Sequence, residues 1–395
     1  MHAHTRSHPL HGDPDLLLLR EALGAVAGES SGDDAALRLI SREPLGEGSV
    51  SGFAQAADSP EQIWYVDTSR LPVRAETGLA TGSDPARPDA RIWTHPADPH
   101  LPALAATAFG HAVTALLARL GLVATGELTM VGYRPGRRAV LRAGTDSGDV
   151  WLKVVRPRRL DRIVGAHHAC VEAGLPVPTL RGWAPEGLLV LDSAAGAPAA
   201  ECGWQPHQLL DSVDGLRARI AAISWDRPAP SIADRLDWYA GRAGDHVEAQ
   251  RLVAGIRTLL ANAPVREHTV VHGDLHFGQL FLADEDADIS GMIDVDTLGR
   301  GDAAEDSAAF IAHAVASARL TGAEHRARIW GLADAALERW DDRRVRALTG
   351  IHLLGQANSA RDHGDMTGAQ MLCRGAQSIV DGDPAEPARS HSEQT

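Results

Sequence analysis

Lysine is almost absent from this chain of 395 residues. Lysine and arginine together number 38, and Lys153 is the single lysine, which leaves 37 arginines. Because a compact ammonium and a planar guanidinium are not interchangeable, a lysine retained in so arginine-rich a chain predicts a position that needs an ammonium group. The alternative is an incidental surface lysine. The apolar neighbours at 150–155 predict a strand, so that Lys153 points from a defined face.

Cysteine and long apolar runs are also scarce. The chain has three cysteines at wide spacing, Cys170, Cys202 and Cys373, which support neither a disulfide framework nor a zinc cage. The N-terminal residues lack the apolar stretch of a signal peptide, and the four leucines at 16–19 are far too few to span a bilayer. These absences predict a cytoplasmic protein that does not enter the membrane.

The charge balance is acidic. The formal net charge is −14, and an acidic surface repels phosphate backbones, so we expect no nucleic-acid partner. Hydrophobic residues make up 44% and charged residues 23% of the chain, as in ordinary globular proteins. The length predicts two or three structural units with a sizeable core.

The apolar periodicity predicts a chain that begins with small β-containing segments and ends mainly helical. Helices are expected at 15–26, 104–120, 160–172 and 303–378, and in most of the chain after 205, where 232–260 is the longest helical segment. Strands are expected at 37–40, 50–54, 63–66, 128–133, 139–142, 150–155, 188–191, 269–272, 279–282 and 289–295. The stretch 71–102 is rich in Pro, Asp, Ala and Gly and predicts a long irregular connection.

The residues most informative about chemistry lie at 270–282. One apolar run ends in the polar loop His272-Gly273-Asp274, and a second apolar run follows the loop. Gln279 comes five residues after Asp274, and Asp294 ends a later apolar run. Phosphoryl transfer needs a carboxylate that aims the acceptor hydroxyl, and hard oxygen ligands for Mg²⁺. Asp274 is suited to the first task, and Gln279 and Asp294 to the second.

This set of motifs resembles the aminoglycoside phosphotransferase and choline kinase superfamily. The resemblance covers about 128–320 and includes the lysine strand, His272-Gly273-Asp274, Gln279 and Ile293-Asp294. It implies an α+β, bilobal protein-kinase-like fold, with an antiparallel-sheet N-lobe and a mainly helical C-lobe. It also implies transfer of the γ-phosphate of ATP, with Mg²⁺, to a hydroxyl of a small-molecule acceptor such as a sugar, an amino sugar or an aminoglycoside-like alcohol.

The resemblance also assigns residues. Asp274 is similar to the catalytic base, Gln279 and Asp294 to the Mg²⁺ ligands, and Lys153 to the phosphate-binding lysine. The turn 133–138 takes the place of the phosphate-covering loop, with Arg134 and Gly136 as candidate nucleotide contacts. The strand 188–191 resembles the hinge beside adenine, with Leu191 as its candidate contact. Asp306 resembles the acid that supports the catalytic loop.

Two departures from the family pattern are visible. Most members have Asn where this chain has Gln279, and the pattern from Asp274 to Gln279 is more similar to the maltokinase and actinobacterial glucosamine kinase branch. Those proteins carry an extra N-terminal cap, which suits residues 14–100 here. The family usually has a glutamate on the helix after the lysine strand, but this helix offers only Asp161 near its start and Glu172 at its end.

Two other functions remain open. His272, Asp274 and His276 alternate and would share one face of a strand, as in a metal-dependent phosphoesterase, for which Asp98-Pro99-His100 is the one candidate partner. A nucleotide-binding pseudokinase is the other alternative, favoured by the missing glutamate.

The expected domain organisation has five parts. They are a disordered tail at 1–13, an N-terminal extension or cap at 14–122, a nucleotide-binding N-lobe at 123–195, a helical C-lobe with the catalytic loop at 196–381, and a disordered tail at 382–395. The sequence leaves the oligomeric state and the identity of the acceptor open.

Overall fold

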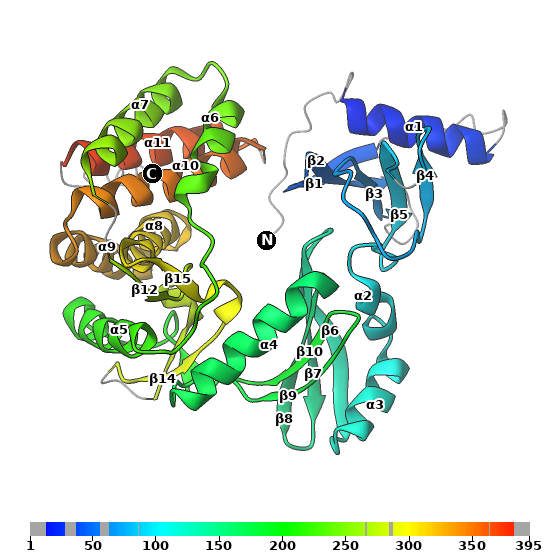
Figure 1. The fold of residues 1–395 in the computed structure, drawn as a ribbon, viewed down its shortest axis with the longest axis horizontal. Coiled ribbons are helices and arrows are strands. Elements are labelled where there is room, and N and C mark those ends of the chain that lie inside the picture. The colour runs from blue at the N-terminus through cyan, green and yellow to red at the C-terminus, as the bar shows by residue number, and fades with distance from the viewer. Residues whose placement is uncertain are drawn as a thin grey trace. The chain divides into compact units, whose positions relative to one another are not determined.

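The computed structural model (Figure 1) describes residues 13–27, 37–55, 63–85, 87–264, 267–283, 287–362 and 364–382. The two expected tails therefore lie almost wholly outside the described residues. The chain divides into two compact units, of which the first contains Met1–Asp161 and Thr179–Ser193. The second contains Arg162–Pro178 and Ala194–Thr395. The finer domain boundaries stay predictions.

The first unit begins with a helix packed on an antiparallel sheet. Its elements are α1 (Pro14–Ala27), β1 (Leu37–Leu45), β2 (Gly48–Gln55), β3 (Ile63–Asp67), β4 (Leu79–Thr81) and β5 (Ala90–Thr94), with the strand order β1-β2-β3-β5-β4. Leu16 and Leu19 of α1 pack against Phe53 and Val66 of the sheet. The predicted irregular stretch 71–102 is wrong in part, because β4 and β5 lie within it. Their short apolar runs are surrounded by Pro and Asp, which conceals them in the sequence.

A second antiparallel sheet follows in the same unit. It contains β6 (Ala124–Arg134), β7 (Arg138–Thr145), β8 (Gly148–Val155), β9 (Leu180–Ala184) and β10 (Leu188–Asp192), in the order β6-β7-β8-β10-β9. Two helices, α2 (Pro102–Thr107) and α3 (Gly110–Arg119), cover one face, where Leu104 and Leu117 pack with Leu152 and Val154. The single helix expected at 104–120 is thus two helices. Lys153 alternates with the apolar residues of β8, so it projects from the other face of the sheet.

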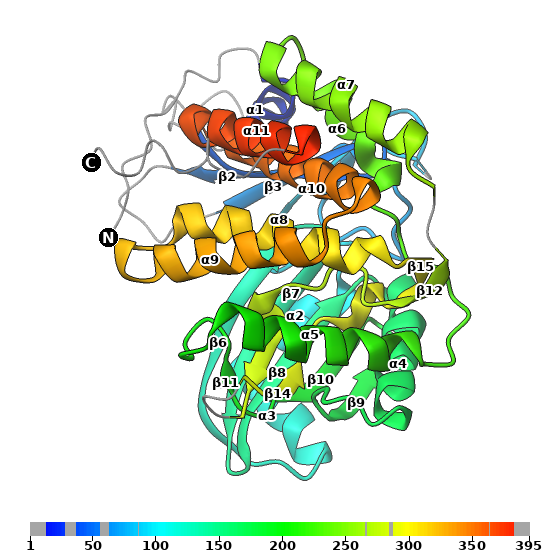
Figure 2. The ribbon, with the colours of Figure 1, turned by 90° about the vertical axis from the view of Figure 1, so that its left-hand side faces the viewer.

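The second unit is mainly helical (Figure 2). Its helices are α5 (Pro206–Ala221), α6 (Leu236–Ala243), α7 (Val247–Asn262), α8 (Ala304–Leu320), α9 (Ala323–Arg339), α10 (Arg343–Asp362) and α11 (Met366–Asp381). Its short strands are β11 (Ala197–Pro198), β12 (His268–Val271), β13 (Leu280–Leu282), β14 (Ile289–Met292) and β15 (Gly299–Asp302). Helix α4 (Pro157–Glu172) begins in the first unit and ends in the second. The α+β fold expected from the sequence is confirmed.

Helix α8 is the most buried helix of the second unit, and other helices pack around it. Figure 2 shows α8 and α9 side by side, and α10 also contacts α8. Ala304, Ala308, Phe310, Ala312 and Ala314 of α8 are fully buried. The helical segment expected at 232–260 is interrupted, because Gly244 adopts a positive φ of 54° between α6 and α7. Among the described residues, no helix combines the length and apolar character needed to cross a membrane.

Candidate active site

The predicted catalytic loop follows β12, which is held in place by antiparallel pairing with β15. Helix α8 fixes the loop from its first turn. The Asp306 carboxylate accepts hydrogen bonds from the backbone N–H groups of His272, at 3.0 Å, and Gly273, at 2.7 Å. Asp306 is buried, and the supporting contact expected for it is therefore confirmed.

The loop turns sharply at Gly273, which has a φ of 82°. A Cβ atom there would lie 3.1 Å from the Thr297 carbonyl oxygen. The backbone angle strains any residue with a Cβ atom, and the close approach adds to the preference for glycine. This turn also ends the alternation expected of a strand through His272, Asp274 and His276.

His272 has a structural position. Its ring is fully buried, and its Nε2–H donates to the carbonyl oxygen of Ile293 at 3.2 Å. The expectation that His272, Asp274 and His276 share a strand face is wrong, because β12 ends at Val271. The described residues contain no group of three or more His, Cys, Asp and Glu side chains that could hold a metal ion.

The Asp274 side chain is 45% exposed and lies beside imidazole groups. His313 of α8 places its Nε2 atom 3.7 Å from Asp274 Oδ1. Burial alone would raise the pKa of Asp274, but His313, His352 and His276 act against it, and the net pKa lies below its usual value. Asp274 is thus a carboxylate at neutral pH, as a hydrogen-bond acceptor for a hydroxyl must be.

The two predicted metal ligands flank one hairpin, with Gln279 directly before β13 and Asp294 two residues after β14. β13 pairs antiparallel with β14, and beyond the last pair the Ile293 N–H donates to the Gln279 carbonyl oxygen at 3.1 Å. This places Gln279 beside the residue that precedes Asp294. Asp294 has a left-handed backbone, with φ 67° and ψ 40°, which costs about 1 kcal/mol for a residue with a Cβ atom. Such an outlier is typical of functional positions.

The donor set fits Mg²⁺. Mg²⁺ takes hard oxygen ligands and uses one or two protein groups together with substrate phosphates and water. Gln279 Oε1 accepts a hydrogen bond from the His276 N–H at 3.1 Å, which aims the amide and leaves a second lone pair on this oxygen. Asp294 supplies the carboxylate. Asp296, the other acid of this segment, is buried on the single turn Val295–Thr297.

In the first unit, Lys153 lies on the central strand β8, between Val140 of β7 and Leu189 of β10. It is 7% exposed, so it is not an incidental surface lysine. Leu191 is buried near the end of β10, two residues before the chain passes into the second unit. The two acids of α4 that could replace the family's usual glutamate, Asp161 and Glu172, are both exposed.

The turn that carries Arg134 and Gly136 is held by the N-terminal part of the first unit. Asp98, which is 1% exposed, accepts hydrogen bonds from the Gly136 N–H at 2.7 Å and from the Tyr133 hydroxyl at 2.9 Å. Arg134 pairs with Glu43 of β1 at 2.7 Å. The N-terminal extension therefore fixes this turn. Its nucleotide role stays a prediction, and the Gly136 N–H is already bonded to a carboxylate.

Sequence reasoning gave one of these side chains another role and missed a second. The sequence singles out Asp98 only as a candidate partner in a metal-dependent phosphoesterase site, and only the fold brings it to the turn. His313 could have been found, because it follows Asp306 by seven residues and the two therefore share a face of α8. Phe310, four residues after Asp306 on the same face, packs inside the core and marks this face as inward.

From the sequence, four further side chains are either candidate pocket residues or members of an exposed helix face: Asp237, Trp238, Arg300 and Glu305. No interaction described for them reaches Asp274. Asp237 is exposed and pairs with Arg257 at 2.8 Å, and Arg242 lies 5.0 Å from the Trp238 ring. Arg300 donates to the His268 carbonyl at 2.8 Å. Glu305 is buried and accepts from the Ser231 hydroxyl at 2.6 Å.

The burial of Glu305 has a measurable effect on the pH dependence of stability. Burial, reinforced by Asp302 and Asp306, raises the pKa of Glu305 from 4.5 to about 7. Between these values the unfolded chain is ionised while the folded protein keeps the proton, so the free energy of unfolding falls as pH rises. Glu305→Gln cannot ionise. We expect the stability of the variant relative to wild type to increase by about 2–3 kcal/mol from pH 5 to pH 8, measured by urea unfolding. An unchanged difference between the two pH values would contradict the raised pKa.

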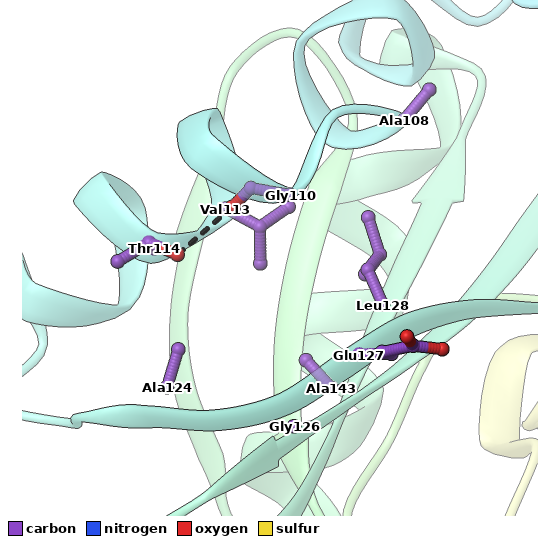
Figure 3. Close-up of a pocket in the computed structure, with 9 residues that line it drawn as sticks. All are labelled: Ala108, Gly110, Val113, Thr114, Ala124, Gly126, Glu127, Leu128 and Ala143. Atoms are coloured by element: carbon purple, nitrogen blue, oxygen red, sulfur yellow. Dashed lines mark hydrogen bonds between the residues drawn. The ribbon is translucent and has the colours of Figure 1, made fainter.

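One pocket of about 370 Å³ lies in the first unit, between the start of α3 and strands β6 and β7 (Figure 3). Small or apolar residues line most of it, including Ala108, Gly110 and Leu128. The only charged lining group is the exposed Glu127. None of the predicted site residues lines this pocket.

Comparisons with known proteins show which family and which folds this chain is similar to. A family model described as the phosphotransferase enzyme family matches residues 131–348, whereas no curated protein matches the chain. The fold is similar to the macrolide 2'-phosphotransferase MphH from Brachybacterium faecium, with 18% identity over 69% of this chain and 97% of that one, and a TM-score of 0.43. It is also similar to the amicoumacin kinase hAmiN, with 13% identity over 70% and 95% of the two chains and a TM-score of 0.49.

A third similar structure is the ternary complex of a thermostable aminoglycoside phosphotransferase APH(4)-Ia with AMP-PNP and hygromycin B. It shares 18% identity over 67% of this chain and 96% of that one, with a TM-score of 0.48. The family model includes the lysine strand, the catalytic loop, the β13–β14 hairpin and α8. Because it covers more than half of the chain, this protein belongs to the phosphotransferase enzyme family.

Proposed function

We propose that this protein is an ATP- and Mg²⁺-dependent kinase that phosphorylates a hydroxyl group of a small molecule. The observation that carries the proposal is the loop from His272 to Gln279. It presents a half-exposed carboxylate at Asp274, and the β13–β14 hairpin brings Gln279 opposite Ile293, the residue that precedes Asp294. Family membership supplies the reaction class, and these residues supply the groups that the reaction needs.

Asp274 would accept a hydrogen bond from the acceptor hydroxyl and aim its oxygen at the γ-phosphate. As the new P–O bond forms and the bond to the β-phosphate oxygen breaks, the hydroxyl proton passes to the Asp274 carboxylate. Gln279 and Asp294 would hold Mg²⁺, which when bound neutralises charge on the phosphate oxygens. Lys153 would place an ammonium group beside the phosphates.

The acceptor class rests on the family resemblance. We propose a sugar, an amino sugar or an aminoglycoside-like alcohol, with Gln279 favouring the maltokinase and glucosamine kinase branch. A coupled ADP-release screen against sugars, amino sugars and aminoglycosides tests this proposal. Release stimulated by one acceptor class is the expected result, and acceptor-independent release across the whole panel would contradict it.

Lys153 is expected to react with an acyl-phosphate derivative of ATP, which acylates amines next to the phosphates. Because the chain has one lysine, the adduct can be assigned from one peptide, and the N-terminal amine serves as an internal control. Excess ATP should protect Lys153 and leave the control unchanged. Lys153→Arg keeps the charge but changes its shape, so kcat/KM for ATP should fall about tenfold or more. Labelling without protection, together with a fully active arginine variant, would show that the lysine has no role at the nucleotide.

A further inference from the structure

Three imidazole side chains from three different elements lie around Asp274. His276 belongs to the catalytic loop, His313 to α8 and His352 to α10. The rings of His276 and His313 are stacked, with centroids 4.0 Å apart and an interplanar angle of 11°. The His352 ring meets His313 edge-on, with centroids 6.5 Å apart. The ring of His313 is therefore held on two sides.

We infer that His313 is a positioning residue for the catalytic carboxylate: its Nε2–H donates to Asp274 and fixes the orientation in which Asp274 receives the acceptor hydroxyl. This inference rests on the proposed function of Asp274. The stacked neighbour sets the plane of the His313 ring, and its Nε2 atom is the one that faces Asp274 Oδ1, at 3.7 Å. Catalytic hydrogen bonds are often long without substrate and shorten in the complex.

The other two imidazoles are committed elsewhere. The His276 side chain accepts a hydrogen bond from the Gln279 backbone N–H, and burial beside His313 lowers the pKa of His276 to about 3. Burial, with His313 nearby, lowers the pKa of His352 to about 4. Both rings are thus uncharged at neutral pH. His276 shapes the turn that carries Gln279, and His352 supports His313 from α10.

Helix α8 gives this arrangement its rigidity. Asp306 in its first turn holds the backbone of the catalytic loop, and His313, two turns later on the same face, reaches the side chain of the same loop. One helix thus fixes both the position of the loop and the orientation of its carboxylate. A displacement of a catalytic group by about 1 Å can lower the reaction rate about 10²-fold.

Two substitutions separate hydrogen bonding from packing. His313→Phe keeps a planar ring that stacks on His276 but removes the N–H. His313→Gln loses the ring but places an amide N–H the same number of bonds from the backbone. We expect kcat to fall about 10²-fold in His313→Phe with KM for ATP unchanged, and His313→Gln to be at least about tenfold faster than the phenylalanine variant. Equal losses in the two variants, or a fully active phenylalanine variant, would overturn the inference.

A second measurement is independent of activity. In ¹H–¹³C spectra of the imidazole groups, the signal that is missing from His313→Phe identifies His313. This signal should move in Asp274→Asn and stay in place in Asp341→Asn, which changes a comparably exposed carboxyl paired with Arg346. An unmoved signal in Asp274→Asn would overturn the contact even if no acceptor is found. Failure of the proposed function would appear separately, as a wild-type protein that turns over no acceptor.

Discussion

Asp274→Asn is expected to lower kcat by about 10²–10⁴, the usual contribution of a general base, and to leave nucleotide affinity unchanged. The amide has nearly the shape of the carboxylate, but it cannot accept the proton of the acceptor hydroxyl. The loop itself should persist, because Asp306 holds the backbone of His272 and Gly273 and not the Asp274 side chain. The measurement is steady-state turnover at saturating ATP and acceptor, with calorimetry for nucleotide binding.

Asp341→Asn is the matched control for this variant. Both side chains are about half-exposed, at 45% for Asp274 and 52% for Asp341, and both variants lose one negative charge. The control should turn over at the wild-type rate. A near-normal kcat in Asp274→Asn would remove Asp274 as the base of the mechanism, whereas a wild-type protein that turns over no acceptor would favour a pseudokinase with a regulatory role.

Asp294→Asn is expected to abolish the Mg²⁺-dependent part of nucleotide binding. The carboxylate is the one charged group of the proposed ligand pair, and the family resemblance assigns it the principal metal contact. Asparagine is the informative substitution here, because Asp294 has a left-handed backbone that asparagine tolerates and alanine does not. A loss of binding in the asparagine variant is then an effect of charge and not of backbone strain.

Gln279 tests the second half of the pair. Gln279→Asn restores the residue that most of the superfamily carries, but the side chain is one methylene shorter and Mg²⁺ tolerates little change in ligand distance. We expect Gln279→Asn to bind Mg²⁺ more weakly, so that Mg²⁺-dependent nucleotide binding needs a higher metal concentration. The loss of nucleotide affinity should be smaller than in Asp294→Asn. Isothermal titration of nucleotide with and without Mg²⁺ measures both variants. Unchanged magnesium dependence in Asp294→Asn would falsify the metal site.

The sequence predicted the part of the fold that local pattern determines. The three strands of the 128–155 series and the helices after 303 follow from apolar periodicity, and they appear where expected. Strands β4 and β5 were not predicted, because their pairing with β3 and with each other depends on residues distant in sequence. Gly244 shows the same limit in the helical part: its positive φ ends α6, whereas isolated glycines are tolerated within other helices.

The residues of the candidate site also divide into those that a local motif marks and those that only the fold brings together. Asp274, Gln279 and Asp294 were found because they lie within about twenty residues on a motif whose spacing carries the chemistry. The contact of Asp98 with Gly136 crosses 38 positions of the sequence, so no local pattern records it. The contact of His313 with Asp274 crosses 39 positions, and only the spacing of His313 from Asp306 on α8 points to it. The hydrogen bond from Gly136 to Asp98 is also the physical link between the N-terminal extension and the predicted nucleotide loop.

The most direct test of phosphoryl transfer is to identify its product. Wild-type protein, ATP, Mg²⁺ and the acceptor that stimulates ADP release are incubated, and the mixture is followed by ³¹P NMR and mass spectrometry. We expect a new phosphomonoester signal, an acceptor heavier by one phosphate, and the loss of both with Asp274→Asn. Formation of ADP and inorganic phosphate alone, with the acceptor unmodified, would contradict it.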